Sequence, residues 1–285
     1  MIQDIYPYIF HNEYRPNQQA NETSQIICMQ EEKILVAPSE TIVFPRGADF
    51  SKEIYMSSTY LFSITDEKEE ISFFLLDVLG KDVQFPAGFV WKEVRKLRDE
   101  LRGDRHLLFA AFTACHLAKW YRSSQYCGCC GHRMEHSKTE RAMVCTHCAN
   151  TVYPKIMPAV IVAVTDKDRI LITQYKRGYR HSALIAGFTE IGETLEETVQ
   201  REVMEEAGLR VKNIRYYKSQ PWGIASDLLV GFYCEVDGAT EIRMDEGELS
   251  CAEWVKREDV QLQPDNKSLT NEMMMNFKFQ KSENY

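Results

Sequence analysis

Residues 187–209, GFTEIGETLEETVQREVMEEAGL, constrain the fold of this 285-residue chain more than any other segment. Thr194 followed three residues later by Glu197 is a capping box, so a helix is predicted to begin near Leu195. Apolar residues then recur at every fourth position and give that helix a buried side: Leu195, Val199, Val203 and Ala207. Gly208 is placed to end the helix in a left-handed turn. The segment therefore predicts a loop, an amphipathic helix and a second loop.

Three glutamates of this helix share one face, because Glu202, Glu205 and Glu206 are spaced i, i+3 and i+4. Such crowding is self-repulsive unless a cation neutralises it, and carboxylates are ligands that Mg²⁺ and Mn²⁺ prefer. A run of acids more often marks a solvated helix face. Here Arg201 lies among the acids and glycines stand at both ends of the segment. We therefore expect a divalent metal site for phosphate chemistry.

The complete pattern, from Gly187 through Glu193 and Arg201 to Gly208, resembles the Nudix box. That box is the signature of hydrolases that cleave nucleoside diphosphates linked to another moiety. The resemblance implies an α/β/α sandwich, in which a loop-helix-loop holds a divalent metal against a pyrophosphate.

Composition excludes several other classes of protein. A hydrophobic content of 44% supports packed cores, and a net charge of −8 argues against non-specific binding of nucleic acid. No apolar run approaches the length of a membrane helix, and the N-terminus lacks the features of a secretory signal. We therefore expect a cytoplasmic protein without membrane contact.

The pattern along the chain predicts an α+β protein of three domains. Residues 1–125 would be a small, mainly β domain that ends in a connecting helix over residues 91–122. The apolar runs that predict its strands are residues 33–37, 41–44, 59–64 and 71–78. A cysteine-rich insert at 126–152 precedes a C-terminal domain at 153–285.

The C-terminal domain shows strand and helix signals around the box. Its predicted strands are a hairpin of 158–164 with 169–175, followed by 213–217, 228–236 and 253–255. A last helix is predicted over 268–279.

The cysteine cluster predicts a structural zinc site, one per chain. Two C-x-x-C knuckles are separated by fourteen residues and supply four thiolates: Cys127, Cys130, Cys145 and Cys148. A four-thiolate site is closed to water, so its role is structural rather than catalytic. Cys129 is expected to be a neighbouring free thiol. The histidines nearby are expected to be bystanders or to support the ligands: His132, His136 and His147.

A ribbon placed directly before a Nudix domain resembles the NADH pyrophosphatase subgroup of that family. YCGCCGH at 126–132, SKTERAM at 137–143 and YPKIMPAVIVAV at 153–164 resemble its sequences. SQPW at 219–222 matches the first four residues of its SQPWPFPxS array. The resemblance implies hydrolysis of the pyrophosphate bond of NAD(H), with NMN(H) and AMP as products, by a homodimer.

The rest of the array departs from the subgroup. GIASD stands at 223–227 where PFPxS is expected, so two prolines and an aromatic ring are missing. Asp227 brings a carboxylate to the place of a hydroxyl, which would repel a phosphate unless a cation screens it. The preferred dinucleotide therefore stays open between NAD(H) and relatives such as ADP-ribose.

The resemblance also implies metal-binding roles for individual residues. Glu202 and Glu206 correspond to the principal ligands of Mg²⁺ or Mn²⁺, and Ala186 offers a backbone carbonyl. Glu205 would be a third ligand or the group that activates water, and Glu248 matches a distal glutamate that reaches the same metal.

Further residues are implied in substrate binding. Phe188 would stack on the nicotinamide ring, while Gln220 and Trp222 would line the other side of the pocket. The remaining candidates near the substrate are Tyr153, Glu140 and Arg98, with Asp227 at the altered end of the array. The aromatic residues could instead belong to the core, and Glu140 could be a surface charge. Arg201 is expected to pair with a box glutamate.

Three functions remain open from the sequence. The first is a small-molecule dinucleotide pyrophosphatase. The second is removal of the NAD cap from RNA 5′ ends by the same bond cleavage. The third is a non-catalytic nucleotide sensor, which loss of box glutamates would favour, but all of them are present.

Overall fold

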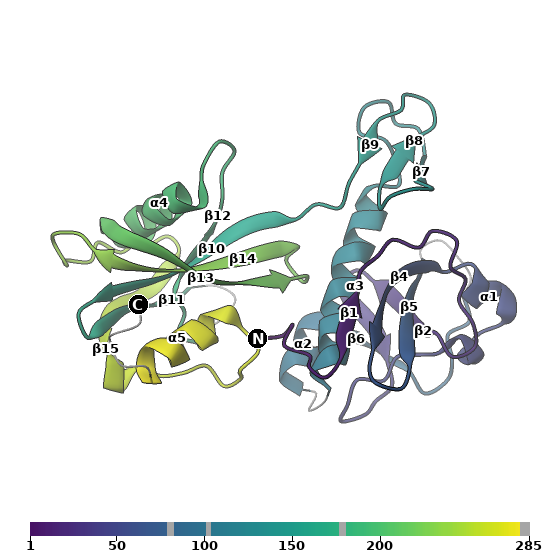
Figure 1. Cartoon of the computed structure of the whole chain (residues 1–285), viewed down its shortest axis with the longest axis horizontal. Helices are drawn as coiled ribbons and strands as arrows, with labels where there is room; N and C mark the ends of the chain where they lie inside the picture. Colours follow the sequence, from purple (N-terminus) through teal and green to yellow (C-terminus); the bar gives the residue numbers. More distant parts are fainter. Residues whose placement is uncertain (79–82, 101–103, 177–180, 280–285) are drawn as a thin grey trace. The chain divides into compact units, whose positions relative to one another are not determined.

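The computed structural model of the chain describes residues 1–78, 83–100, 104–176 and 181–279. The chain forms two compact units (Figure 1). The C-terminal unit comprises Met1–Ile2, Ile156–Pro221 and Asp227–Tyr285. The N-terminal unit comprises Gln3–Lys155 and Trp222–Ser226, so it includes the cysteine-rich insert.

A six-stranded sheet forms the centre of the C-terminal unit. Its order is β13-β14-β10-β11-β15, with β12 paired to β10. The strands are β10 (Met157–Asp166), β11 (Arg169–Tyr175), β12 (Ile185–Phe188), β13 (Val211–Trp222), β14 (Asp227–Val236) and β15 (Leu249–Lys256). β10 runs parallel to β14 and antiparallel to β11 and β12.

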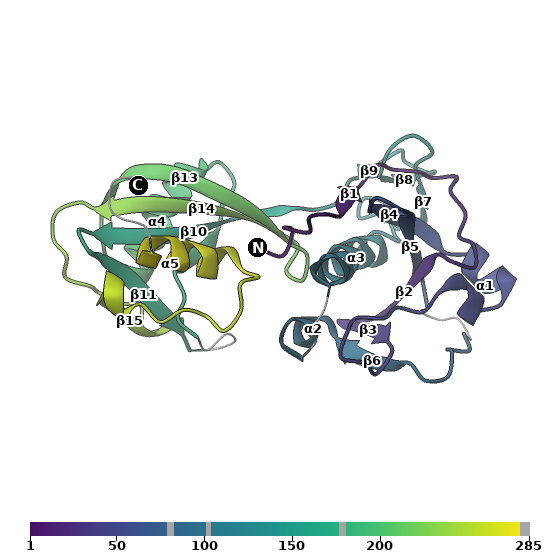
Figure 2. The ribbon, with the colours of Figure 1, turned by 60° about the horizontal axis from the view of Figure 1, so that its bottom comes forward.

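Helices α4 (Leu195–Ala207) and α5 (Leu269–Phe279) cover opposite faces of this sheet (Figure 1). Successive residues of β10 face opposite sides, as the pleat of a strand requires. Val160 and Val162 pack in the cluster with α4, whereas Ile161 and Ala163 pack in the cluster with α5. Figure 2 shows α5 lying across β10 and β14. The predicted α/β/α sandwich is confirmed.

Most elements predicted for this unit are present. β10 and β11 form the expected hairpin, and Lys167 in its turn has a φ of 57°. The last helix lies within one residue of its predicted start. β13 and β15 extend well beyond the predicted 213–217 and 253–255. The 3-10 helix η2 (Arg257–Asp259) follows β15.

The N-terminal unit contains a second six-stranded sheet of order β1-β4-β5-β2-β3-β6. Its strands are β1 (Ile9–His11), β2 (Gln25–Gln30), β3 (Lys33–Val36), β4 (Thr59–Thr65), β5 (Glu70–Leu76) and β6 (Val90–Glu93). Its helices are η1 (Gly47–Asp49), α1 (Lys52–Met56), α2 (Val94–Glu100) and α3 (Arg105–Ser123). α3 packs against β2 and β4 of the sheet.

Two predictions for this unit are wrong. Residues 91–93 are not helical but lie in β6, where Trp91 pairs with Leu35 of β3. Residues 41–44 form no strand, although Ile42 and Phe44 are buried. The backbone there bonds across an irregular turn instead, with Val43 accepting from the N–H of Ala37 at 2.9 Å.

The cysteine-rich insert folds as a three-stranded sheet of β7 (Met134–His136), β8 (Met143–Cys145) and β9 (Thr151–Val152). It is tied to the rest of the N-terminal unit by Arg141, whose Nη2 donates to the carbonyl of Leu61 at 2.7 Å. None of the helices in the described ranges is long and apolar enough to cross a membrane.

Candidate active site

Helix α4 has the ends that its sequence predicts. Thr194 Oγ1 accepts the N–H of Glu197 at 3.2 Å, and Glu197 Oε2 accepts the N–H of Thr194 at 2.7 Å, which completes the capping box. Gly208 ends the helix with a φ of 68°. Val199, Val203 and Ala207 are fully buried. Burial of this stripe fixes the rotation of the helix, and therefore the direction in which its carboxylates point.

Glu206 is the buried carboxylate of the site, with 2% of its surface exposed. Its Oε1 accepts the backbone N–H of Ala186 at 3.4 Å, and the hydroxyl of Tyr175 lies 3.4 Å from its Oε2. Burial raises the pKa of Glu206 to about 8, and the charges of Glu202 and Glu248 act in the same direction. Burial also raises the pKa of Tyr175, so its hydroxyl remains a donor. A bound cation would let Glu206 ionise at neutral pH.

Arg201 pairs with the box glutamates, as predicted. Its Nη1 donates to Glu202 Oε1 at 2.7 Å and to Glu205 Oε2 at 3.0 Å. Its Nη2 donates to the carbonyl of Phe188 at 2.9 Å. Desolvation raises the pKa of Glu202, whereas the guanidinium holds the pKa of Glu193 at about 2. Arg201 therefore links the β12 strand, the loop and the acidic face of α4.

Gly187 lies so close to the Glu202 carboxylate that a side chain at position 187 would collide with it. A Cβ atom at Gly187 would lie 1.9 Å from Glu202 Cδ and 2.0 Å from Oε1. Only a residue without a side chain leaves room for this carboxylate beside β12. The first glycine of the motif thus has a steric explanation.

Glu248 lies in the loop before β15, and its side chain is exposed. The carbonyl of Glu248 accepts the N–H of Lys176 at 2.9 Å. The same loop is held to the end of α4, where the carbonyl of Glu206 accepts the N–H of Asp245 at 3.0 Å. The structure therefore brings Glu248 to the box from a distant part of the chain.

The donor set fits a hard divalent cation. Glu202, Glu206 and Glu248 offer carboxylate oxygens, β12 offers the carbonyl of Ala186, and a buried carboxylate needs a positive charge nearby. Within the described residues, these carboxylates do not form a group of three whose oxygens all lie within 4.8 Å of one another. Glu202 is paired with Arg201, so binding a cation would draw its side chain away from that partner.

Phe188 at the end of β12 is half exposed, with 50% of its surface accessible. It stands directly after the backbone of Ala186 and Gly187. Its carbonyl is bonded to Arg201 of α4, and an exposed aromatic ring at this strand end is suited to stacking on a base or a nicotinamide.

Gln220 and Asp227 occupy buried positions in the C-terminal unit. Gln220 braces the start of α5, because its Nε2 donates to the carbonyl of Lys267 at 2.8 Å and its Oε1 accepts the N–H of Leu269 at 2.7 Å. Asp227 begins β14 in register with Met157. Both side chains are built into the fold rather than displayed on its surface.

Trp222 and Arg98 lie together in the N-terminal unit. The guanidinium of Arg98 stands 5.3 Å from the centre of the Trp222 ring. The Trp222 ring also makes an edge-to-face contact with Phe112, at 5.2 Å between centroids. In the same unit Tyr153 donates its hydroxyl to Glu140 Oε1 at 3.0 Å, and both residues are exposed.

Gly223 follows Trp222 and approaches the α3 backbone. A Cβ atom there would lie 2.1 Å from the carbonyl oxygen of Phe112. The proline that the resembled array carries at this place could not be accommodated without a backbone shift. Glycine instead of proline at this position therefore allows the close packing of residue 223 against α3.

The four predicted zinc ligands converge. The Sγ atoms of Cys127, Cys130, Cys145 and Cys148 all lie within 4.8 Å of one another. The backbone N–H of Cys129 donates to Cys127 Sγ at 3.4 Å and lowers the pKa of that thiol to about 6. Cys129 itself is exposed and outside the group. Four clustered cysteine sulfurs fit a tetrahedral zinc ion.

The two histidines stack on each other beside this cluster, His132 on His147 with centroids 3.8 Å apart. With Cys130 they form a second group of potential ligands. His136 lies elsewhere, stacked on Tyr121 of α3.

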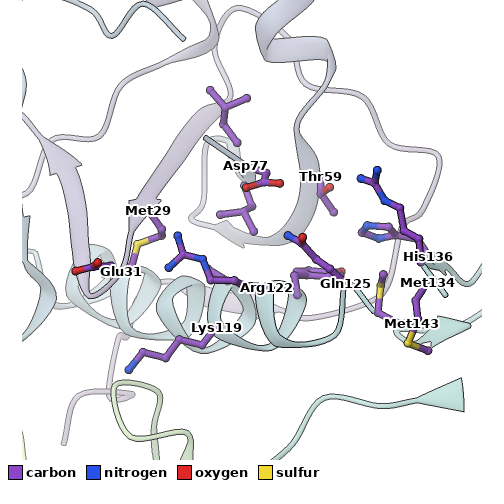
Figure 3. A pocket seen from close by; sticks show the side chains of 15 residues that line it. Met29, Glu31, Thr59, Asp77, Lys119, Arg122, Gln125, Met134, His136 and Met143 are labelled. Atoms are coloured by element: carbon purple, nitrogen blue, oxygen red, sulfur yellow. The ribbon is translucent and has the colours of Figure 1, made fainter. Parts of the chain in front are cut away.

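A cavity of about 170 Å³ lies within the N-terminal unit, between its sheet, α3 and the ribbon (Figure 3). Met29 and Thr59 line it from the sheet and Arg122 from α3, while Asp77 and Gln125 line it from just after β5 and α3. None of the predicted site residues lines it. All the residues that line the cavity belong to the N-terminal unit.

Two residues of the site were missed in the sequence. Glu193 belongs to the motif, and the structure shows that it accepts two hydrogen bonds from Arg201. Tyr175 carries no motif at all and reaches Glu206 only through the fold of β11. The sequence offered one indication of this role, a tyrosine hydroxyl at the end of an otherwise apolar strand.

The NUDIX domain family matches residues 155–277, and the NADH pyrophosphatase zinc ribbon domain matches residues 122–153. An NAD-capped RNA hydrolase NudC from Klebsiella pneumoniae is 45% identical over 175 residues, which cover 60% of this chain and 67% of that protein. NudC from Salmonella paratyphi B is 44% identical over 174 residues, with the same coverage. A solved NUDIX hydrolase from Nitrosomonas europaea is 21% identical, covers 48% of this chain and 80% of its own, and has a TM-score of 0.42.

Proposed function

This chain belongs to the Nudix hydrolase family, and we propose that it cleaves the pyrophosphate bond of NAD(H) to give NMN(H) and AMP. The observation that carries the proposal is the buried Glu206, whose pKa is raised further by the charges of Glu202 and Glu248. Because its relatives are hydrolases and all box glutamates are retained, the sensor hypothesis has lost its support.

Glu202, Glu206, Glu248 and the carbonyl of Ala186 would hold Mg²⁺ or Mn²⁺ in this site. A divalent cation held by these groups would screen the phosphate oxygens and lower the pKa of a water molecule. The oxygen of water bonds to one phosphorus, the bridging P–O bond breaks, and the other phosphate leaves. Glu205 is exposed at this face and would be a further ligand or take the proton of the water.

The protein positions the rest of the substrate with few groups. Phe188 offers a ring face for the nicotinamide or the adenine. Arg201 keeps Glu202 and Glu205 oriented through its hydrogen bonds. Trp222, Arg98, Tyr153 and Glu140 remain proposed substrate contacts of the N-terminal unit.

Removal of the NAD cap from RNA is the second candidate, favoured by the names of the relatives. Both reactions break the same pyrophosphate bond. The two substrates differ only in whether the adenosine is free, as in NAD(H), or is joined to an RNA chain. The net charge of −8 offers no broad attraction for RNA. Any preference for capped RNA would therefore depend on local contacts.

A substrate panel tests the proposal. NADH, ADP-ribose and a short NAD-capped RNA would be incubated with Mg²⁺ or Mn²⁺, and the products resolved by chromatography. We expect NMNH and AMP from NADH, and loss of both when Glu206 is replaced by Gln. Hydrolysis of ADP-ribose alone would assign a different substrate, and no hydrolysis of any compound would overturn the proposal.

We further propose that the active form is a homodimer in the cytoplasm. A reducing compartment suits a ribbon whose four thiolates must stay free of disulfides. Sedimentation at micromolar concentration would test the assembly, and a fully active monomer would contradict it. Fractionation of cells with an antibody would test the compartment.

A further inference from the structure

Strand β11 changes register where it reaches the carboxylates. Gln174 pairs with Cys251 of β15, but the next residue, Tyr175, pairs with Leu249, so Ser250 is passed over. The hydroxyl of Ser250 donates to the carbonyl of Gln174 at 3.0 Å and supports this irregular place. Bulges of this kind bend a strand and redirect its side chains, and they are frequent next to active sites.

The redirected side chain of Tyr175 ends at Glu206. Its hydroxyl lies 3.4 Å from Oε2 and 3.5 Å from Oε1 of that carboxylate, and 3.5 Å from the carbonyl of Leu184. The backbone N–H of Ala186 approaches Oε1 from the other side at 3.4 Å. A phenol and an amide thus restrain a side chain that could otherwise rotate about three bonds.

The neighbouring residue, Lys176, holds the backbone of the loop that carries Glu248. The N–H of Lys176 donates to the carbonyl of Glu248 at 2.9 Å, and Lys176 Nζ donates to the carbonyl of Glu246. Consecutive residues at the end of β11 therefore contact Glu206 and the loop of Glu248. These two glutamates lie far apart in sequence, and this strand end is a structural link between them.

We propose that Tyr175 is a positioning residue of the cation site, whose hydroxyl holds the carboxylate of Glu206 in its ligating orientation. The inference rests on the proposed metal-binding role of Glu206. Groups that orient a ligand without touching the metal commonly change metal affinity about 10- to 100-fold. Because the contacts here are long, we expect the lower end of that range.

The variant Tyr175→Phe removes the hydroxyl and keeps the ring that packs in the fold. We expect its affinity for Mn²⁺ to fall about tenfold, measured by electron paramagnetic resonance on the full, zinc-loaded chain. Its kcat should recover at high Mn²⁺, while the Mn²⁺ concentration for half-maximal activity rises. A merely structural role would lower kcat at every Mn²⁺ concentration and leave the half-saturation unchanged.

Tyr217→Phe is the matched control. Tyr217 donates its hydroxyl to Glu272 of α5 at 3.4 Å, so this variant also removes one tyrosine–glutamate contact from the same unit. Its Mn²⁺ affinity should equal that of the wild type. If both variants bind Mn²⁺ as the wild type does, Tyr175 has no positioning role.

If Tyr175→Phe also lowers thermal stability, a double variant with Glu206→Gln can still test whether the hydroxyl acts through Glu206. In the Glu206→Gln background, Tyr175→Phe should have little further effect on Mn²⁺ affinity, because its target is already altered. An equal loss in both backgrounds would overturn the inference. If Glu206→Gln alone leaves Mn²⁺ binding unchanged, Glu206 is not a metal ligand and the proposed function fails as well. The failure of the positioning role can therefore be told apart from the failure of the proposed function.

Discussion

Arg201 donates to both carboxylate oxygens of Glu193, with Nε 2.5 Å from Oε1 and Nη2 2.9 Å from Oε2. Oε2 also accepts the hydroxyl of Thr198 at 3.0 Å and the N–H of Glu190 at 3.0 Å. This two-pronged pair ties the loop before α4 to the middle of the helix. Such geometry is specific to arginine, and lysine could not reproduce it.

The Arg201–Glu193 pair predicts a pH-dependent stability. The guanidinium lowers the pKa of Glu193 from about 4.5 to about 2 in the folded chain. A depressed pKa stabilises the fold above the unfolded value and loses that effect as pH falls. Glu193→Gln should therefore lower the thermal midpoint at pH 6, and the difference from wild type should shrink between pH 4.5 and pH 2. A constant difference across this window, measured by circular dichroism, would contradict the assignment.

Glu206→Gln should keep the fold and reduce kcat by two or more orders of magnitude, about 3 kcal/mol of transition-state stabilisation. The amide fills the same buried space but cannot carry the negative charge. Glu196→Gln, an exposed change in the first turn of α4, is the control and should stay fully active. Near-normal turnover of the Glu206 variant would remove the box from the mechanism.

Gly187→Ala should separate activity from stability. The new methyl group would occupy the place of the Glu202 carboxylate, which is the mobile end of a side chain and can move away. We expect the thermal midpoint to change little, whereas kcat/KM falls at least about tenfold, or 1.4 kcal/mol. Equal losses of stability and activity would show that the glycine serves the fold instead.

The ribbon should contain about one tightly held zinc ion per chain, measured by elemental analysis. Cys145→Ser should destabilise or aggregate the protein, because binding energy of a structural zinc is also folding energy. Cys129→Ser changes an exposed thiol outside the group and should be silent. A zinc-free protein with an unchanged thermal midpoint would refute this assignment.

Gly223→Ala should destabilise the chain by about 1–3 kcal/mol, because the added carbon meets the backbone of Phe112 and not a flexible side chain. Gly128→Ala is the control, since nothing lies within 4 Å of its Cβ position. Chemical denaturation followed by tryptophan fluorescence would measure both. An unaffected Gly223 variant would show that the 222–226 segment can move.

Local sequence predicted those features that depend on neighbours in the chain. The capping box at Thr194, the buried stripe of α4 and the C-x-x-C knuckles each lie within a short segment, and the structure confirms all three. β6 was missed because Trp91 becomes a strand residue by pairing with Leu35, far away in sequence.

Separation in sequence also explains why some contacts of the site could not be predicted. Tyr175 contacts Glu206 across 31 positions of the chain, at a place where β11 shifts its register with β15. Gln220 matched a motif, yet its amide serves the main chain near Lys267. A motif fixes which residue is present, but packing of distant segments decides what that residue contacts.

Helix α4 also has a side that none of these constraints reaches. Glu196, Gln200 and Met204 are exposed and follow one another at four-residue intervals. None of the three belongs to the capping box, the buried stripe or the carboxylate group, so substitutions there should disturb none of these. Neutral sequence drift, and the attachment of a probe or a solid support, should therefore be tolerated along this line of the helix.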